Sequence, residues 1–405
     1  MDSLTQIILG AAVGEIALGK KIGNRALIWG AIGGTIPDLD VLANTFMDPI
    51  EALAFHRSIS HSLFFSVVGG AVFAWVVNQL YERQWHKTWP YKILIALVNA
   101  AIVISVAYGI NILFKSDSGV QWWIMIITGA GALYLLWRLY KYYLIKDLES
   151  PQATFKEWYW LFFLALATHW ILDCFTAFGT QIFQPFSDYR VALNNIAVVD
   201  PIYTIPFLIC VILVAFVKRN TRKRKFYNWL GIGISSAYML FTLVNKVYVD
   251  SVFDKALAHR NIQVEKCQCS PTIFNNILWS CTAKNNENIY SGQYSIFDSD
   301  PNFHYLNIIP LHDSIGVKLS AYKEYKTLEW FSKGYLAAFP TDSVIYLSDL
   351  RYGGMTDTIN GPKDLIFNFK VKEENGKYVF TESREQPEGP ISDLLLKFYK
   401  RIKGY

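Results

Sequence analysis

Long runs of nearly uncharged residues are the feature that most constrains what this chain can fold into. They recur through the first 245 residues and then stop. An α-helix needs about 20 apolar residues to cross the hydrocarbon core of a bilayer, and several of these runs have that length. The chain of 405 residues is 52% hydrophobic with a mean hydropathy of +0.22, which is too apolar for an ordinary soluble protein. The pattern predicts an integral membrane protein.

The runs predict a polytopic, all-α membrane bundle of about eight helices at residues 1–245. The first two runs are short for a membrane crossing, so we expect them to pack as a hairpin inside the bundle. After residue 250, short alternating segments such as NIYSGQYSIFD and DSVIYLSDLRYG indicate strands. A β-rich soluble domain is therefore predicted at residues 250–405, with a last helix at 391–402. The expected bundle helices cover residues 4–18, 26–36, 58–80, 93–114, 120–137, 158–178, 196–217 and 226–245.

Basic residues set the expected orientation of the bundle. The segment KRNTRKRK at residues 218–225 holds six basic residues in eight, and short loops rich in Lys and Arg stay in the cytoplasm. Counting outward from this loop places the N-terminus and the C-terminal domain on the outer face of the membrane. The net charge of +5 comes from basic residues clustered between apolar runs, so it predicts topology and no nucleic-acid patch.

Three of the five cysteines, Cys267, Cys269 and Cys281, fall in the predicted outer domain. One disulfide among them is expected if that domain faces an oxidising compartment. The alternative is a metal site at the Cys-x-Cys pair, although no second pair or nearby histidine completes a zinc pattern. Which two cysteines would pair stays open.

Several side chains that bind divalent metals fall at helix ends on the predicted outer side. His169 and Asp173 are four residues apart and project from one face of a helix. Mixed nitrogen and oxygen ligands suit zinc, manganese or iron better than copper or calcium, so we expect one or two such ions, with zinc favoured. Taken alone, the Pro-Asp-x-Asp segment is typical of a turn that ends a helix, and the two histidines of HRSISH are typical of a helix cap. The six expected ligands are Asp38, Asp40, His56, His61, His169 and Asp173.

Two arginines and a threonine are expected to bind an anionic substrate such as a phosphate. Arg57 lies in the HRSISHS segment, and Thr180 and Arg190 lie in the outer loop GTQIFQPFSDYR. Guanidinium groups match the oxygens of a phosphate. Contact with lipid headgroups is the alternative role of each arginine. Arg190 is also a catalytic candidate that would stabilise developing charge, and Asp38 or Asp40 could act as a base when not ligating.

Two further carboxylates lie within apolar runs, where an unpaired charge is costly. We expect Glu15 to pair with Lys20 or Lys21 or to face a polar cavity. Asp200 is expected to support a metal-binding histidine through a hydrogen bond. Both are interpreted as structural.

A set of segments occurs in one order over about residues 1–245 and resembles the YdjM-type family of bacterial inner-membrane proteins assigned as metal-dependent hydrolases. The segments are MDSLTQIILGAAVGE, PDLD, HRSISHS, THWILD, FGTQIFQPFS and VVDPIYT, with weaker likeness in PTIFNNILW and LSDLRYG. That family is distantly similar to zinc-dependent phospholipases C and fungal single-strand nucleases. The resemblance implies a bacterial inner-membrane location and the six metal ligands above, and in those relatives the amino terminus can also be a ligand. Family members commonly carry a histidine where this chain has Gln6. Either one ligand is missing or Gln6 binds weakly through its carbonyl oxygen, so the resemblance implies one or two ions, or an inactive descendant, and not a full three-metal cluster.

The leading expectation is a membrane-bound, metal-dependent hydrolase at the outer face of the cytoplasmic membrane. Its substrate would be a phosphoester, such as a phospholipid or a lipid-linked envelope precursor, and membrane lipid would be its partner. One alternative is a non-catalytic envelope scaffold with a structural metal. A transporter is the other, but its polar residues would follow a path through the bilayer, whereas here they gather on one side. The sequence predicts no oligomeric state.

Overall fold

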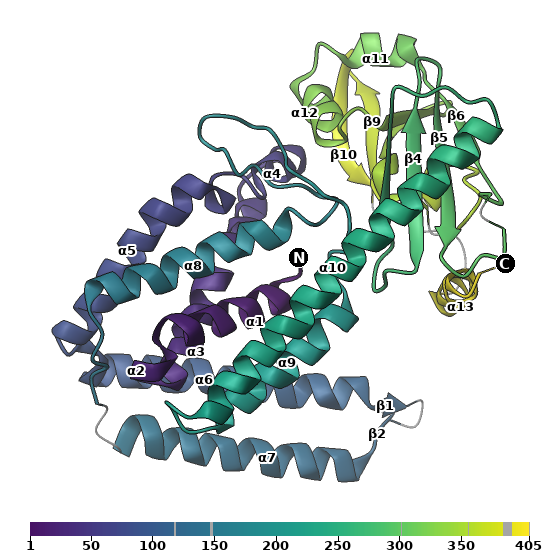
Figure 1. The fold of residues 1–405 in the computed structure, drawn as a ribbon. Coiled ribbons are helices and arrows are strands. Elements are labelled where there is room, and N and C mark those ends of the chain that lie inside the picture. The colour runs from purple at the N-terminus through teal and green to yellow at the C-terminus, as the bar shows by residue number, and fades with distance from the viewer. Residues whose placement is uncertain (117–118, 146–148, 301, 355, 384–390, 405) are drawn as a thin grey trace. The chain divides into compact units, whose positions relative to one another are not determined.

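The structure, a computed structural model, describes residues 1–116, 119–145, 149–300, 302–354, 356–383 and 391–404. Over these ranges the N-terminal part is helical and the C-terminal part is rich in β-sheet (Figure 1). The chain forms two compact units. One unit comprises Met1–Ala71 and Trp160–Tyr405, and the other is Val72–Tyr159.

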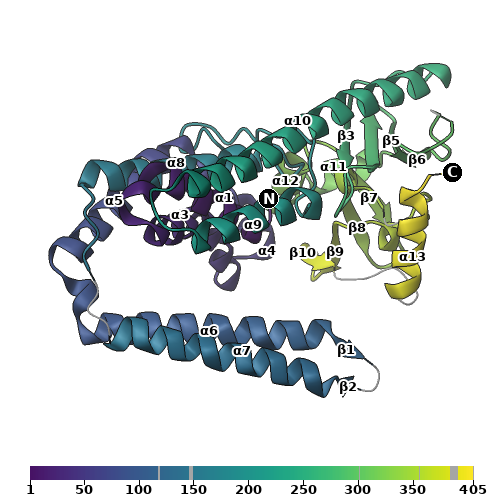
Figure 2. The ribbon, with the colours of Figure 1, turned by 60° about the horizontal axis from the view of Figure 1, so that its bottom comes forward.

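The unit at Val72–Tyr159 holds the end of α5 (Leu63–Glu82) and the antiparallel helices α6 (Trp89–Leu113) and α7 (Trp122–Tyr140) (Figure 2). The amide of Asn111 in α6 donates to the hydroxyl of Thr128 in α7 at 2.8 Å. Such polar contacts join helices in lipid, where apolar side chains gain little by meeting each other. Most apolar side chains of this pair are exposed, as expected of surfaces that face lipid.

Four helices in the described ranges are long and apolar enough to cross a membrane, namely α5, α6, α7 with its extension to Ile145, and α10 (Arg222–His259). A fifth crossing results if α3 (Asn24–Thr35) and the bent 3-10 helix Pro37–Thr45 count as one span. The remaining helices in the predicted apolar runs are shorter or less apolar, with α1 at 12 residues and α9 (Pro201–Phe216) at 16. The expected number of about eight helices is therefore not confirmed.

The first helical hairpin is held together by glycines. α1 (Ser3–Gly14) and α3 carry Gly10, Gly14, Gly30 and Gly34, spaced four residues apart on each helix. A Cβ atom added to Gly10 would overlap the carbonyl oxygen of Gly30, and one added to Gly30 would overlap that of Gly10. Small residues at this spacing let two helix backbones approach closely in a membrane. The two short predicted helices thus pack directly against each other.

Both structural carboxylates have partners other than those expected. Glu15 accepts two hydrogen bonds of 2.7 Å from the guanidinium of Arg224, so the expected pairing with Lys20 or Lys21 is wrong. The planar fork of arginine matches a carboxylate bidentately, which lysine cannot do. Asp200 caps α9 by accepting from the backbone of Ile202 and Tyr203, and it also accepts from Tyr238. Asp200 therefore caps the N-terminus of α9, and the expected support of a metal-binding histidine is wrong.

Helix α10 links the bundle to the C-terminal part. Its 38 residues span about 57 Å, nearly twice the hydrocarbon thickness of about 30 Å. It continues without a break through the predicted domain boundary at residues 245–250. In the C-terminal half of α10, Val249, Phe253 and Ala256 pack in one core with Trp279 and Tyr294 of the sheet.

The C-terminal part contains two antiparallel four-stranded sheets. The first has the order β3-β4-β5-β6 and the second the order β10-β9-β8-β7. Helices α11 (Asp313–Leu319) and α12 (Lys323–Phe331) connect them, and α13 (Ile391–Ile402) matches the predicted last helix. The strands are β3 (Lys266–Pro271), β4 (Leu278–Lys284), β5 (Asn288–Ser295), β6 (Asn307–Pro310), β7 (Leu336–Pro340), β8 (Ile345–Asp349), β9 (Asn368–Glu374) and β10 (Lys377–Ser383).

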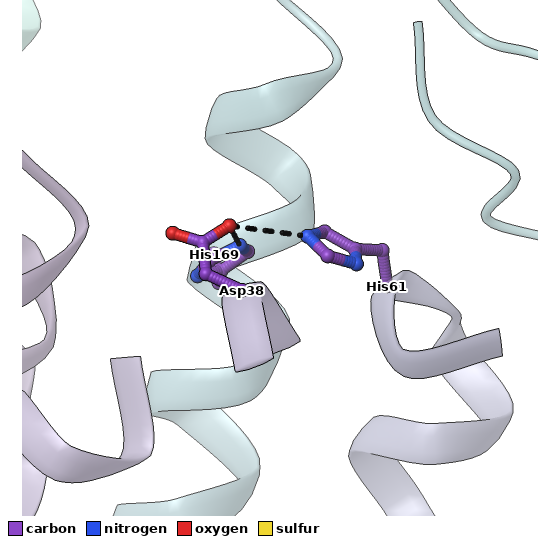
Figure 3. Close-up of side chains that lie close together, drawn as sticks. All are labelled: Asp38, His61 and His169. Atoms are coloured by element: carbon purple, nitrogen blue, oxygen red, sulfur yellow. Dashed lines mark ion pairs between the residues drawn. The ribbon is translucent and has the colours of Figure 1, made fainter. Parts of the chain in front are cut away.

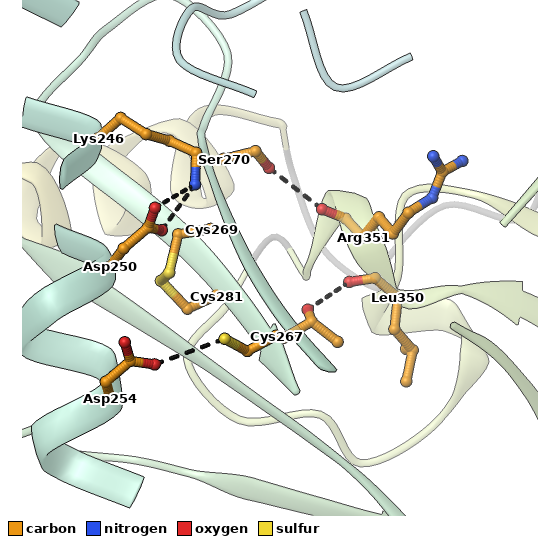
Figure 4. The surroundings of a disulfide bond; sticks show 10 residues. Lys246, Asp250, Asp254, Cys267, Cys269, Ser270, Cys281, Leu350 and Arg351 are labelled. Carbon is orange, nitrogen blue, oxygen red and sulfur yellow. Dashed lines mark hydrogen bonds and ion pairs between the residues drawn. A yellow bond between two sulfur atoms is a disulfide. The ribbon is translucent and has the colours of Figure 1, made fainter. Parts of the chain in front are cut away.

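One disulfide joins Cys269 and Cys281, which face each other across β3 and β4 (Figure 4). The expected single disulfide is thereby confirmed and its pairing assigned. Cys267 is free and exposed, and its thiol contacts Asp254 at 3.5 Å. The same two strands bind the segment after β8, because Ser270 donates to the carbonyl of Arg351 at 3.2 Å.

The glycine contact between α1 and α3 generates a first prediction. Gly30→Ala should destabilise the protein by about 1–3 kcal/mol, because the added methyl group must push two backbones apart. Gly131→Ala in α7 is the matched control, since its Cβ would meet no described atom within 4 Å and alanine favours a helix. Thermal unfolding in detergent measures both. Equal midpoints for the two variants would contradict the packing described.

Candidate metal centre

Three separate segments bring the predicted ligands together at one end of the bundle. Asp38 lies in the 3-10 helix Pro37–Thr45, which begins after α3 ends, and His61 lies in the short turn Ile59–His61. His169 and Asp173 occupy the last turns of α8 (Phe155–Asp173). Figure 3 shows the carboxylate of Asp38 between the two imidazole rings, with the Nε2 atoms of both histidines turned toward it.

Two imidazole nitrogens and two carboxylate oxygens alternate around a small ring, which we call the His–Asp ring. Asp38 Oδ1 lies 3.6 Å from His61 Nε2 and 3.5 Å from His169 Nε2. Asp173 Oδ2 lies 3.4 Å and 3.5 Å from the same two nitrogens. Ligand atoms bound to one zinc ion at about 2.0–2.2 Å are separated by distances of this order. Within the ring, Asp38, His61 and His169 offer ligand atoms that all lie within 4.8 Å of one another, so these three residues have the size and the donor set of a divalent-metal site.

Three atoms that face the centre of the ring make no hydrogen bond. They are His61 Nε2, His169 Nε2 and Asp173 Oδ2, all buried, and Asp173 Oδ2 has in addition an ion pair with Arg57 Nε at 3.4 Å. Leaving a buried polar atom unpaired costs about 1–3 kcal/mol, and more for a charged group. Three such atoms converging on one point are difficult to explain as a stable hydrogen-bond network. A cation coordinated by all of them removes that cost, so the residues fit a metal ion.

Both ring histidines are oriented through their other nitrogen. His169 Nδ1 lies 2.6 Å from the backbone carbonyl oxygen of Gly34, which can only accept a hydrogen bond. His61 Nδ1 lies 3.3 Å from Asp40 Oδ2 and 3.0 Å from the hydroxyl of Ser60. Partners of this kind fix the tautomer and the ring orientation of histidines that bind metals. In the neutral form with the proton on Nδ1, the Nε2 of each histidine has a lone pair directed into the ring.

Asp40 and His56, also predicted as ligands, form a second layer beside the ring. Asp40 Oδ1 lies 2.8 Å from His56 Nδ1, while Asp40 Oδ2 accepts from the backbone of Arg57 and from Ser60. The side chain of His56 is 30% exposed, in contrast to the fully buried His61. Of the six predicted ligands, the structure thus brings four into the ring and places two behind it.

Asp173 is the most heavily contacted member of the ring. Its Oδ1 is paired with the ammonium group of Met1 and accepts a hydrogen bond of 3.0 Å from the amide of Gln6. Its Oδ2 lies 3.4 Å from Arg57 Nε. Gln6 also donates to the carbonyl of His169 at 3.1 Å. The residue that departs from the family pattern therefore lies against the ring and orients one of its carboxylates.

The three predicted substrate residues, Arg57, Thr180 and Arg190, are all buried. Arg57 touches the ring through Asp173, donates to Thr176 at 2.8 Å and lies over the ring of Phe178. Arg190 lies over the same Phe178 ring and donates to the carbonyl of that residue. Thr180 is buried and pairs its backbone with Val191.

Sequence reasoning missed the groups that orient the ring. The group of Gly34 that orients His169 is a backbone carbonyl, which no residue type in a sequence indicates. Thr176 is identified only by the hydrogen bond that it accepts from Arg57. Phe178 contacts both arginines and also His56, with the ring centroids of Phe178 and His56 5.2 Å apart. It lies only five residues after Asp173, so its place near the site follows from the end of α8.

The ring predicts which histidines are needed for metal. His169→Ala and His61→Ala should each lower the zinc content of protein purified in detergent at least tenfold, because each removes a ligand whose loss costs more than about 1.4 kcal/mol. His56→Ala is the matched control and should retain metal, since His56 lies outside the ring. Elemental analysis measures all three. Metal lost equally from all three variants, or absent from the wild type, would contradict the assignment.

Comparison with known proteins agrees with the N-terminal part of this description. A family model described as YdjM inner membrane protein matches residues 1–249, which contain all four residues of the His–Asp ring. No curated protein and no solved structure shows significant similarity to the chain, so the expected likeness to phospholipases C and nucleases stays a prediction. Since the match covers more than half of the 405 residues, the chain belongs to the YdjM inner membrane protein family.

Proposed function

We propose that the protein is a metal-dependent hydrolase that cleaves a phosphoester at the outer face of the inner membrane. The observation that carries this proposal is the convergence of His61 Nε2, His169 Nε2 and Asp173 Oδ2, all buried and without hydrogen-bond partners. Asp38 completes the donor set from its partly exposed position. A divalent ion held there would polarise a phosphoryl oxygen and make bound water a nucleophile near neutral pH.

The side chains beside the ring supply the rest of the chemistry. Arg57 presents a buried guanidinium group next to Asp173, where it would stabilise negative charge on a transferring phosphoryl group. His56 forms a dyad with Asp40 through Nδ1. Its Nε2 is thereby left to carry a proton to or from a substrate or water, as a histidine oriented by a carboxylate does. We therefore assign His56 a proton-transfer role in place of metal binding.

Three observations favour hydrolysis over the other two functions considered. The polar residues form one compact cluster at helix ends, which supports a reaction centre more than a path for transport. A purely structural metal would need neither the partly exposed His56 with its partner Asp40 nor Arg57 beside the ligands. The family is one of inner-membrane proteins, which favours an amphiphilic substrate such as a phospholipid or a lipid-linked envelope precursor.

Catalysis is tested with separate substitutions in the His–Asp ring and in the His56–Asp40 pair. Protein loaded with zinc should hydrolyse bis(p-nitrophenyl) phosphate or a phospholipid, and Asp173→Asn should abolish both metal binding and turnover. His56→Gln should keep the metal but lower kcat by about 10²-fold or more, the usual contribution of a general acid or base. His312→Gln, an exposed histidine of the C-terminal part, is the control and should be fully active. Activity that survives in Asp173→Asn would disprove metal-dependent hydrolysis at this site.

The Cys269–Cys281 disulfide supports an outer location for the C-terminal part, because disulfides persist in oxidising compartments. Cys267 offers a direct test, since it is exposed while Cys174 and Cys210 are buried. We expect a membrane-impermeant maleimide to label Cys267 in spheroplasts without lysis, and Cys267→Ser to remove the label. Labelling that occurs only after lysis would show that the C-terminal part faces the cytoplasm and would contradict the proposed orientation.

The pH dependence of this labelling follows from the surroundings of the Cys267 thiol. Partial burial, followed by the charge of Asp254, raises the pKa of the Cys267 thiol to about 11. The reactive thiolate is the deprotonated form, so the labelling rate should rise about tenfold per pH unit from pH 7 to 9. Asp254→Asn should accelerate labelling at pH 7, because it removes the negative charge that disfavours the thiolate.

A further inference from the structure

Three positively charged side chains gather where the C-terminal part meets the loop after α8. Arg190 comes from that loop, Lys333 follows α12 directly, and Arg351 lies in the turn Leu350–Tyr352 after β8. The guanidinium carbons of Arg190 and Arg351 lie 4.3 Å and 5.0 Å from the ring centre of Phe331. We call Arg190, Lys333 and Arg351 the cationic cluster.

Arg351 is already paired and firmly held. Its Nη2 lies 2.6 Å from Asp349, and its Nη1 donates to the carbonyl of Ala177 at 3.4 Å. Its backbone carbonyl accepts from Ser270 of β3, next to the disulfide (Figure 4). Arg351 is thus a fixed part of the scaffold whose own charge is compensated by Asp349.

Arg190 is buried but only partly paired. It is 4% exposed and donates from Nη2 to the backbone carbonyl of Phe178, whereas Nε and Nη1 have no partner. Burial and then the charge of Arg351 lower its pKa to about 9. Burial, Arg351 and Arg190 likewise lower the pKa of Lys333 to about 8. Positive charge is therefore in excess here, and a buried unpaired cation is costly.

An apolar cavity of about 470 Å³ adjoins this cluster. The carbonyl of Ala177 accepts from Arg351, and Ala177 also lines the cavity, as does Tyr352, the next residue after Arg351. The volume lies within the range of natural small-molecule sites, about 300–1,000 Å³. Other lining residues come from the loop before α9, from the segment after β3 and from the amphipathic helix α13; they include Ile196, Val198, Ile273, Phe274, Leu395 and Phe398.

We propose that the cationic cluster and the adjoining cavity form a binding site for an acidic phospholipid. Its phosphate would accept from Arg190 Nη1, with Lys333 adding a second positive charge, because guanidinium and ammonium groups both bind phosphate oxygens. One acyl chain would fill the apolar cavity. An anion here would supply a partner that Arg190 lacks, and the acyl chain would remove the apolar lining from water.

As a substrate assignment this inference rests on the proposed hydrolase function. Arg57, which contacts the His–Asp ring, and Arg190 of the cationic cluster both lie over the ring of Phe178. Binding itself does not need the metal. The site would then deliver a phospholipid headgroup toward the His–Asp ring, and the C-terminal part would supply half of the substrate site.

The test measures binding to delipidated, full-length protein stripped of metal with EDTA, so that its result does not depend on hydrolysis. Phosphatidylglycerol, diacylglycerol and inorganic phosphate are titrated separately and followed by native mass spectrometry or by thermal shift. We expect phosphatidylglycerol to bind at least about tenfold more tightly than either of the other two, which each fill only half of the site.

Matched variants separate the two halves of the site. Lys333→Gln and Arg190→Gln should weaken phosphatidylglycerol and phosphate but leave diacylglycerol unchanged. Ile273→Glu, at a side chain 48% exposed, should weaken both lipids but leave phosphate unchanged. Lys318→Gln and Ile308→Glu, at side chains each 60% exposed, are the controls and should bind like the wild type.

Two results would overturn the proposal. Equal affinity for diacylglycerol and phosphatidylglycerol would show that the cationic cluster binds no phosphate. Phosphate binding as tight as that of phosphatidylglycerol, unaffected by Ile273→Glu, would identify a site for a free anion and not for a lipid. Because Lys333 is partly exposed, its variant keeps the test valid if Arg190→Gln fails to fold.

Discussion

The hydrogen bond between His169 Nδ1 and the carbonyl of Gly34 connects the packing of the bundle to its chemistry. Gly34 can approach α8 and α1 together only because it has no side chain; a Cβ there would overlap the backbone at Gln6. The same glycine contacts place α3 so that Asp38 follows it at the ring. The close helix packing and the orientation of a metal ligand are therefore consequences of one constraint.

Acidic and basic groups both gather near Phe178. The carboxylates of Asp38 and Asp173 lie beside the two ring histidines, and Arg57, which lies over Phe178, is paired with Asp173. Arg190 also lies over Phe178, and the cationic cluster to which it belongs has more positive than negative charge, with Asp349 committed to Arg351. Such a distribution of charge favours a phosphoester as the substrate.

The sequence predicted those features that depend on local spacing. His169 and Asp173 share a helix face at four residues apart, and the apolar runs identified the helices that became α5, α6, α7 and α10. It could not separate His56 from His61, because the chain between them is not helical: α4 (Pro49–Phe55) ends before His56, and Arg57 adopts a left-handed backbone with φ of 59°.

Long-range partners were equally beyond the sequence. Arg224 lies 209 residues from Glu15, and no local rule selects it over the adjacent lysines. The cationic cluster combines residues from the loop after α8 and from two separate turns of the C-terminal part. Such clusters arise from tertiary packing alone, which explains why Arg190 was predicted as an anion ligand while Lys333 and Arg351 were not considered.

The central claim is that two histidines and two aspartates of the bundle share one divalent ion. X-ray absorption at the zinc edge of the purified, zinc-loaded protein tests it most directly. We expect nitrogen and oxygen neighbours at about 2.0–2.2 Å, with the outer-shell scattering of two imidazoles. A shell containing sulfur, or one without imidazole scattering, would contradict it.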